Sequence, residues 1–377
     1  MSAPALPSLC RPPESVQPLL AALADPAATR IYDESDWDHL IPLARTARLL
    51  GVLAHRVFEQ VDRSALPDRV VRHLDAGRFE ARFRHQKTLY LLHTITPTLA
   101  DHPGPWILLK GAAYIAQDLP LARGRLPTDV DLMVPRASLD GIEQALKNAG
   151  WEFEKNDPYD QHYYRAWSHE LPAMIAAGQA MELDLHHTIL PPVGRIKPDT
   201  ARLFADAVPV PGSPFHVLCP HDQLLHAVVH LVYDSDFVGR LRDLLDIDAL
   251  FRRLPLSDHA ARRALVERAR LHGMEKPLRL ATNLCRGWFG TPGCDALFAE
   301  TSGTVSVFYG NRVASLASRV LPPINAREGS TQFAARLLEG RSHWLRMPPW
   351  LLAYHAASKG IRSLSQLATK RERPAEG

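Results

Sequence analysis

The pattern of apolar residues divides the chain into helical sections around a shorter section with strand patterns. Between residues 37 and 100, apolar residues recur every three or four positions, as on one face of an amphipathic helix. The same spacing returns over residues 224–232 and 241–250 and continues to about residue 367. The sequence therefore predicts helical regions on both sides of a central section that mixes strands and helices.

The central section opens with a short apolar run of strand length, residues 106–109. The run stops at Lys110 and Gly111, and a helix-compatible segment follows over residues 112–119. A strand, a tight turn and a helix fit this order best. Such a turn leaves backbone N–H groups facing outward, so we expect a seat for phosphate there. Lys110 would add a point charge, and Gly111 would permit close approach of the backbone.

Two further strand patterns carry acidic residues. Apolar residues over 130–134 are interleaved with Asp129 and Asp131, and residues 181–189 begin with strict alternation that places Asp184 among the polar positions. Successive side chains of a strand point to opposite faces, so Asp129 and Asp131 project together from one face. If the second strand lies beside the first, Asp184 adds a third carboxylate at the same point.

Three ionised carboxylates this close repel one another unless a cation compensates them. Mg²⁺ prefers oxygen ligands from one or two carboxylates, completed by substrate phosphates, whereas zinc sites favour His or Cys. The expected cofactor is therefore Mg²⁺ or Mn²⁺, held by Asp129, Asp131 and Asp184. Arg125, four residues before Asp129, would reach phosphate oxygens with its forked donors.

Composition and charge narrow the class of protein. The 377 residues are 46% hydrophobic and 23% charged, which indicates a soluble globular chain with room for more than one core. The net charge of +3 gives no overall attraction to nucleic acid or anionic lipid, so we expect neither DNA nor a membrane as partner. Four scattered cysteines, with no Cys-x-x-Cys pair and no secretory leader, predict reduced thiols and a cytoplasmic location.

Three runs of residues carry a resemblance to a known family. They are Leu108-Leu109-Lys110-Gly111-Ala112, Arg125-Leu126-Pro127-Thr128-Asp129-Val130-Asp131-Leu132-Met133-Val134, and Glu182-Leu183-Asp184-Leu185-His186. Over roughly residues 37–288 the chain resembles the uncharacterised nucleotidyltransferase family of the polymerase-beta-like superfamily. The resemblance implies an α+β fold, with a small mixed sheet and helices as its core and helical regions on both sides.

The resemblance also implies a reaction. In this superfamily a Gly-Ser turn holds the triphosphate, an Asp-x-Asp pair binds two metal ions, and a third acidic residue on a later strand completes the site. Ala112 stands where the superfamily has Ser, and the interval from Gly111 to Asp129 is longer than usual. The implied reaction is in-line attack of an acceptor hydroxyl on the α-phosphate of an NTP, with release of pyrophosphate. The sequence does not identify the acceptor, for which a small molecule, a peptide or a protein is favoured over RNA.

The expected site has three groups of residues. The catalytic and metal-binding residues are Asp129, Asp131 and Asp184; the nucleotide-binding residues are Lys110, Gly111, Ala112 and Arg125; the candidate accessory residues are Glu182 and His186. By the resemblance, Lys110 would substitute for the missing Ser hydroxyl. For Glu182 a surface ion pair competes with metal ligation, and for His186 a structural role competes with substrate contact.

Two other polar clusters on expected helices have plainer explanations. His226 and His230 are four residues apart, a spacing that can hold zinc, but no Glu follows His226 as a metalloprotease motif requires. Packing and hydrogen bonding are the favoured roles. Asp243, Asp246 and Asp248 spread around a helix axis, so we expect ion pairs with nearby arginines rather than a second metal site.

The sequence leaves two alternatives open. Glycosyltransferases also use Asp-x-Asp to hold a metal and the diphosphate of a nucleotide sugar. A catalytically silent nucleotide-binding module that acts through a partner protein would be compatible with Ala112. The Lys110-Gly111 turn and the third acidic strand favour an NTP as donor.

We expect five parts along the chain. They are a Pro-rich N-terminal segment (1–30), an N-terminal helical region (31–100), a nucleotidyltransferase core (101–215), a C-terminal helical region (216–369) and a charged tail (370–377).

Overall fold

The fold is available as a computed structural model of the chain. It describes residues 10–233, 237–301, 307–323 and 329–354. The charged tail predicted at 370–377 lies outside the described residues, as do parts of the segments predicted at 1–30 and 216–369.

A seven-stranded mixed sheet forms the centre of the fold, in the order β3-β4-β5-β2-β1-β7-β6. Its strands are β1 (Ile107–Leu108), β2 (Asp129–Met133), β3 (Trp151–Phe153), β4 (Met174–Ala176), β5 (Glu182–His186), β6 (Val208–Pro209) and β7 (His216–Val217). The two longest strands, β2 and β5, are neighbours and run parallel, whereas β1 pairs with β2 antiparallel. The predicted α+β fold, with a small mixed sheet between helical regions, is confirmed.

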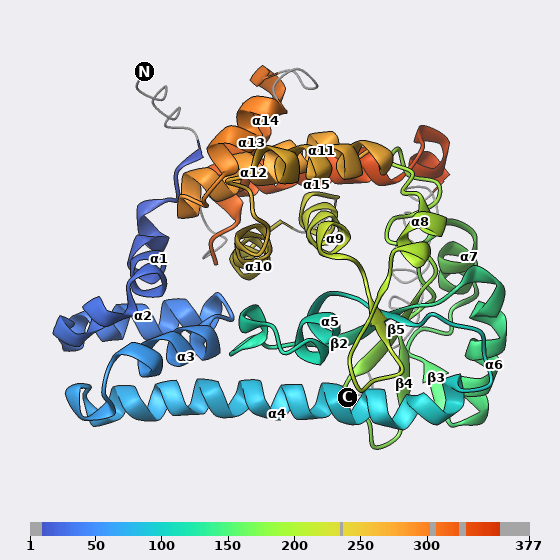
Figure 1. The fold of residues 1–377 in the computed structure, drawn as a ribbon, viewed down its shortest axis with the longest axis horizontal. Coiled ribbons are helices and arrows are strands. Elements are labelled where there is room, and N and C mark those ends of the chain that lie inside the picture. Colours follow the sequence, from blue (N-terminus) through green and yellow to red (C-terminus); the bar gives the residue numbers. More distant parts are fainter. Residues whose placement is uncertain (1–9, 234–236, 302–306, 324–328, 355–377) are drawn as a thin grey trace, which may run out of the picture.

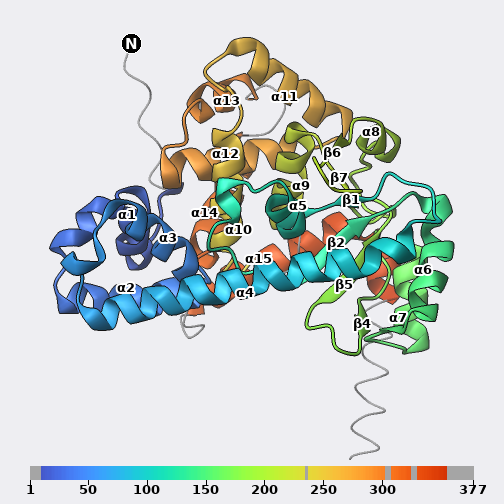
Figure 2. The same cartoon turned by 60° about the horizontal axis from the view of Figure 1, so that its bottom comes forward.

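Helices before the sheet form one side of the molecule (Figure 1). They are α1 (Gln17–Ala24), α2 (Glu34–Thr46), α3 (Leu50–Gln60) and α4 (Asp68–Leu99). Figures 1 and 2 show α4, 32 residues long, running from the N-terminal helices past α5 (Lys110–Ala116) to α6 (Leu139–Asn148). The long helix therefore joins the N-terminal helices to the sheet.

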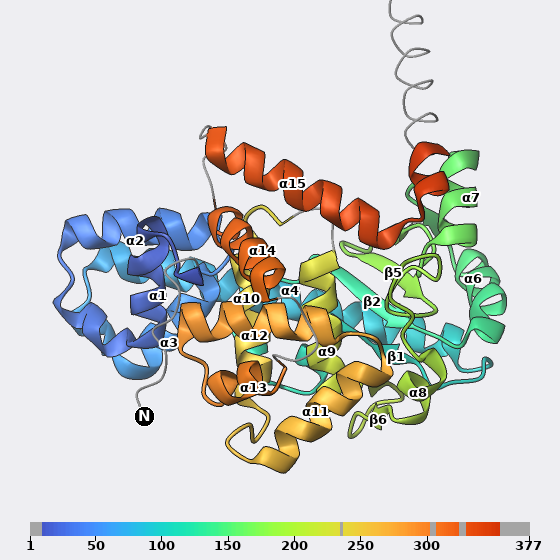
Figure 3. The ribbon, with the colours of Figure 1, turned by 90° about the horizontal axis from the view of Figure 1, so that it is seen from above.

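Helices after the sheet cover the opposite side. They are α9 (Pro220–Tyr233), α10 (Leu241–Arg252), α11 (His259–Leu271), α12 (Glu275–Phe289), α13 (Cys294–Glu300), α14 (Val307–Val320) and α15 (Gly329–Arg346). Helix α9 contacts α5, α10, α12 and α15, so it connects this helical region to the sheet. Figure 3 shows α15 crossing the molecule from α14 to α7 (Pro158–Trp167). Within the described residues, no helix has both the length and the apolar character of a membrane span.

Alternation along the two central strands separates core from site. Val130 and Leu132 of β2 and Leu183 and Leu185 of β5 are fully buried. Because side chains alternate between the two faces of a strand, the acidic residues of both strands turn to the opposite face. The apolar residues of these strands thus fix the direction in which the carboxylates point.

Element bounds differ from the predictions where tertiary contacts decide them. Strand β1 covers only two of the four residues predicted over 106–109, and β5 ends at His186 rather than at residue 189. Helix α5 begins at Lys110 itself, which has a positive φ of 44°, so no separate turn precedes the helix. The start of this seven-residue helix brings Lys110 next to the end of β1.

Candidate active site

In-register pairing of β2 and β5 brings the predicted carboxylates together. Asp131 lies opposite Asp184, and Asp129 lies opposite Glu182. Paired residues of parallel strands point to the same face, so Asp184 shares a face with Asp129 and Asp131. Asp129 and Asp184 both line a cavity of about 230 Å³, which we call the carboxylate cavity. Its lining also includes Lys110, His169, Glu170, Ile189, Leu190, Pro191, Val229, His230, Tyr233 and Arg346.

Asp131 is buried at the floor of this arrangement and has two basic partners. Its Oδ1 lies 2.8 Å from Lys110 Nζ and 3.0 Å from His186 Nε2, and its side chain is 2% exposed. Burial raises the pKa of Asp131, but the charges and hydrogen bonds of Lys110 and His186 outweigh burial and hold this pKa well below its usual range. Asp131 is therefore ionised, and Lys110 stays protonated beside it.

Asp129 and Asp184 have a different electrostatic environment. Within the described residues, no Lys, Arg or His forms an ion pair with either carboxylate inside 4.0 Å. Burial, and then the neighbouring Asp131, raises the pKa of both groups. For Asp184, with Glu170 adding further repulsion, the pKa rises to about 8. If all three carboxyls are ionised, the cluster carries more negative charge than Lys110 and His186 neutralise, and its donors are carboxylate oxygens, so the ionised cluster fits a divalent cation.

A second cavity adjoins the first and is lined by more arginine and lysine side chains. We call it the Arg125 cavity, and its lining is Lys110, Gly111, Tyr114, Arg125, Thr128, Asp129, Ala227, His230, Arg242, Asp243 and Asp246. Lys110, Asp129 and His230 line both cavities. Arg125 is buried, and its Nε donates to Asp246 at 2.9 Å. Lys110, Arg125 and Arg242 line this cavity beside an equal number of carboxylates, and Asp246 and Asp243 pair with the two arginines, so the cavity offers guanidinium and ammonium donors without a net positive charge.

Close packing against Arg125 explains why position 111 is a glycine, and the sequence alone did not show this contact. A Cβ at this position would lie 2.3 Å from Arg125 Nη1, so only glycine allows the guanidinium to lie against the start of α5. Ala112 is 1% exposed, packs in the apolar core and lines neither cavity. The structure therefore brings Lys110, Gly111 and Arg125 together at a cavity but does not bring Ala112 to it.

Residues 33–290 match the family described as uncharacterised nucleotidyltransferase. The chain belongs to this family. The resemblance predicted from the three sequence runs is thereby confirmed. No curated protein and no solved structure matches the chain.

The two candidate accessory residues, Glu182 and His186, differ in their surroundings. His186 is fully buried and hydrogen-bonds Asp131, and its pKa is raised because that bond and the charges of Glu170 and Asp131 outweigh burial. Glu182 is exposed and lines neither of the two cavities, although it lies beside Asp129. His186 thus acts on the site through Asp131, whereas Glu182 lies at its edge.

Several residues that line the carboxylate cavity were not predicted from the sequence. His169 and Glu170 follow α7, and Glu170 forms an isolated bridge with His186. Tyr233 comes from the end of α9 and Arg346 from the end of α15. His169 and Glu170 lie in an irregular segment, where no hydrophobic period predicts the direction of a side chain. Their polar character close to a predicted strand was the one feature of the sequence that could have marked them as site residues.

The histidines of α9 pack as the sequence suggested. The rings of His226 and His230 meet edge to face at 6.3 Å, and Arg240 donates to His230 Nδ1 at 3.0 Å. Burial lowers the pKa of His226 to about 3, so this ring is neutral. Among the described residues, neither histidine belongs to a group of three metal-binding side chains.

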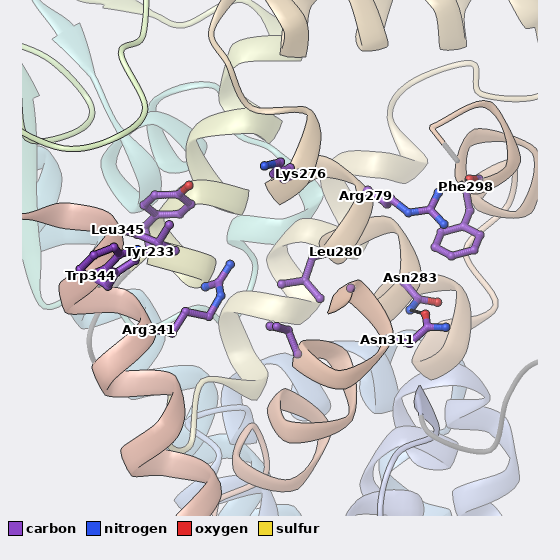
Figure 4. A pocket seen from close by; sticks show the side chains of 12 residues that line it. Tyr233, Lys276, Arg279, Leu280, Asn283, Phe298, Asn311, Arg341, Trp344 and Leu345 are labelled. Atoms are coloured by element: carbon purple, nitrogen blue, oxygen red, sulfur yellow. Dashed lines mark hydrogen bonds between the residues drawn. The ribbon is translucent and has the colours of Figure 1, made fainter. Parts of the chain in front are cut away.

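A third cavity lies beside the carboxylate cavity in the C-terminal helical region (Figure 4). We call it the C-terminal cavity. Its lining is Tyr233, Lys276, Arg279, Leu280, Asn283, Phe298, Gly310, Asn311, Val313, Arg341, Trp344 and Leu345. Tyr233 lines both this cavity and the carboxylate cavity, and Arg346 of the latter follows directly on Leu345. The two cavities are therefore neighbours, joined at the end of α9 and the end of α15.

Proposed function

We propose that this protein transfers a nucleoside monophosphate from an NTP to an acceptor hydroxyl, with release of pyrophosphate and with the help of a divalent metal ion. The observation that carries the proposal is the placement of Asp184 opposite Asp131, on the face that also presents Asp129 to a cavity. Membership of the nucleotidyltransferase family supports the type of reaction. We also propose a cytoplasmic location, because all four cysteines are free thiols.

Asp129, Asp131 and Asp184 are the residues that would hold the metal, which we propose to be Mg²⁺ or Mn²⁺. Their oxygen donors and their incompletely neutralised charge fit a hard divalent cation. When bound, such ions supply charge neutralisation for the triphosphate and favour the reactive form of the acceptor hydroxyl.

The remaining side chains would position the donor. Lys110 lines both cavities, and its Nζ is fixed by Asp131, so this ammonium can contact phosphate oxygens without first being ordered. Arg125 and Arg242 line the adjoining cavity and would bind the rest of the triphosphate. Asp184, which faces the carboxylate cavity, would orient the acceptor hydroxyl and accept its proton.

The C-terminal cavity is our proposed entry side for the acceptor. It borders the carboxylate cavity at Tyr233. Lys276, Arg279 and Arg341 line it together with the aromatic ring of Trp344, which supports an acceptor that carries a negative group beside an apolar or planar part. A small molecule or a short peptide segment meets this description better than a bulky folded surface.

Transfer of label is the direct test of the proposed function. The full chain is incubated with Mg²⁺ or Mn²⁺ and each α-labelled NTP in a lysate of the host, and labelled products and pyrophosphate are measured. We expect labelling by the wild type and none by an Asp129→Asn, Asp131→Asn double variant. Asp140→Asn, a change at an exposed position of α6, is the matched control and keeps labelling.

The outcomes separate the proposal from its alternatives. Absence of label and of pyrophosphate with every NTP contradicts nucleotidyl transfer. Release of a nucleoside diphosphate from a nucleotide sugar would instead indicate a glycosyltransferase. Tight NTP binding without any transfer would indicate a silent nucleotide-binding module.

A further inference from the structure

A group of nitrogen and oxygen ligands lies next to the carboxylate cluster. One ligand atom each from His169, Glu170 and His186 lie within 4.8 Å of one another. Glu170 Oε2 is 3.6 Å from His169 Nε2 and 3.4 Å from His186 Nε2. Ligands that share one metal ion are separated by about 3 to 4 Å, given bonds of about 2.0 to 2.2 Å to the metal. Small rotations of these side chains would bring all three onto one ion.

The backbone holds the group in place from two sides. The segment after α7 runs beside β5, with the amide of Leu171 donating to the carbonyl of Leu185 at 2.8 Å and the amide of His187 donating to the carbonyl of His169 at 2.9 Å. Between these bonds, Glu170 pairs with His186 as an isolated bridge. The two imidazole rings lie 5.3 Å apart. The three side chains are therefore ordered by main-chain contacts rather than by chance proximity.

Both imidazole rings also have an unsatisfied polar atom. Within the described residues, the Nδ1 atoms of His169 and His186 are buried and have no hydrogen-bond partner. Buried polar atoms in folded proteins are almost always paired, and exceptions often mark a bound ion or water. These Nδ1 atoms are the second nitrogens of the two rings, whereas the Nε2 atoms face Glu170, so the Nδ1 atoms suit a bound water and the Nε2 atoms the metal ion.

We infer that His169, Glu170 and His186 form a binding site for a first-row transition-metal ion. Two imidazole nitrogens and one carboxylate suit Mn²⁺, Fe²⁺ or Zn²⁺, whereas Mg²⁺ prefers oxygen ligands alone. This site differs in chemistry from the all-carboxylate site of the proposed function and does not depend on nucleotidyl transfer.

Asp131 links the two sites. Its Oδ1 hydrogen-bonds both His186 Nε2 and Lys110 Nζ. An ion held by the histidines would displace the first of these bonds, and Lys110 would still keep Asp131 paired. Asp131 therefore stays compensated whether or not the neighbouring ion is bound.

Nitrogen coordination gives the sharpest test, because it needs neither NTP nor acceptor. The full chain is stripped of metal with a chelator and titrated with Mn²⁺ alone, and pulsed electron paramagnetic resonance detects coupling of the bound Mn²⁺ to ¹⁴N. We expect imidazole coupling in the wild type and its weakening or loss in His169→Ala. Loss of one ligand should weaken Mn²⁺ binding by about 10- to 100-fold.

His187→Ala is the matched control. His187 adjoins His186 in the chain but donates from its ring to the carbonyl of Ser168, so its removal should leave the ¹⁴N coupling intact. Glu170→Gln keeps the size of the side chain and removes its charge, so it tests the site in a variant that we expect to fold, which circular dichroism checks.

Each outcome decides the inference. Mn²⁺ bound without ¹⁴N coupling overturns it, as does coupling that both His169→Ala and Glu170→Gln leave unchanged. Loss of coupling in these variants, with label transfer still absent in the wild type, would support the metal site while contradicting the proposed function. Zn²⁺ should displace Mn²⁺ from the site, because zinc binds mixed nitrogen and oxygen ligands more tightly.

Discussion

The fold contains two groups of three aspartates. One is on helix α10, where Asp243 and Asp246 line the Arg125 cavity, and the other is on strands β2 and β5, where Asp129 and Asp184 line the carboxylate cavity. On α10 every aspartate has an arginine, and the pairs are Asp243 with Arg240 and Arg242, Asp246 with Arg125, and Asp248 with Arg252. On the strands, Asp131 alone has basic partners, whereas Asp129 and Asp184 have none among the described residues. Each aspartate on α10 is thus paired with an arginine, whereas two of the three aspartates on β2 and β5 have no basic partner among the described residues.

The pKa values of the aspartates on α10 and of those on β2 and β5 respond differently to burial. Burial raises the pKa of Asp243, but Arg242 and Arg240 outweigh it and lower this pKa strongly. At Asp184, burial acts together with Asp131 and Glu170, and the pKa rises to about 8. Asp246 is intermediate, because burial raises its pKa although Arg125 lies 2.9 Å away. Carboxylates with their own arginines stabilise the fold, and those without are where the charge of a ligand can be added.

Catalysis should show the largest contrast between the two groups. Asp184→Asn removes a proposed metal ligand and should lower the rate of nucleotidyl transfer by about 10²- to 10³-fold or more. Asp248→Asn, in the other group, should keep the rate per folded molecule. Pyrophosphate release under saturating NTP measures both. Equal losses in the two variants would remove the distinction between site and scaffold.

Stability should show the reverse contrast. Asp243→Asn removes the buried charge that both Arg240 and Arg242 contact, and we expect a loss of about 3 to 5 kcal/mol in the free energy of unfolding. Asp184→Asn relieves repulsion in the metal-free protein and should stabilise it by about 1 to 2 kcal/mol at pH 8.5. Urea denaturation of both variants measures these changes. Destabilisation by Asp184→Asn would show that its charge is compensated in the fold.

The pH dependence of stability follows from Asp184. Its pKa is about 8 in the folded protein against an ordinary value of 3.8, so the folded state binds this proton more tightly than the unfolded state. The contribution of Asp184 is fully present below about pH 4 and is lost as the pH rises through about 8. Urea denaturation of the metal-free wild type at several pH values should show this decline. A wild type and an Asp184→Asn variant with the same slope would contradict the assignment.

A smaller loss of stability than that of Asp243→Asn should come from the packing of Gly111 against Arg125, the partner of Asp246. Gly111→Ala places a Cβ 2.3 Å from Arg125 Nη1, so the guanidinium must shift away from its present place beside Asp246. We expect a loss of about 1 to 3 kcal/mol in stability and weaker NTP binding. Gly340→Ala, on α15 with open space around its added Cβ, is the control and should be neutral or slightly stabilising. Denaturation and NTP titration test both variants.

Much of the central sheet was predictable from the sequence. The alternation over β2 and β5 showed which residues face the core and which face outward, and the family resemblance proposed that Asp184 joins Asp129 and Asp131. Strands β3, β4, β6 and β7 have two or three residues each, too few for a period to appear. Their existence depends on pairing with neighbours that the local sequence does not specify.

The rest of the candidate site depends on contacts between distant parts of the chain. Arg125 pairs with Asp246 across 121 positions, and Arg346 reaches the carboxylate cavity from α15. His169 and Glu170 lie in an irregular segment whose place is set by backbone bonds to β5. Hydrophobic periodicity shows which face of a single helix or strand is buried. It therefore predicts neither these ion pairs nor a cavity lined jointly by α5, α9 and α15.

The shared register of β2 and β5 has a consequence for which changes in chain length the protein tolerates. A single residue inserted or deleted within Glu182–His186 would turn Asp184 toward the apolar layer and Leu183 or Leu185 toward the cavity. An insertion near Gly178, in the turn between β4 and β5 where an added Cβ meets nothing, would leave that parity unchanged. The fold should therefore tolerate an insertion or deletion in the turn. It should not tolerate one within the five paired positions of β5.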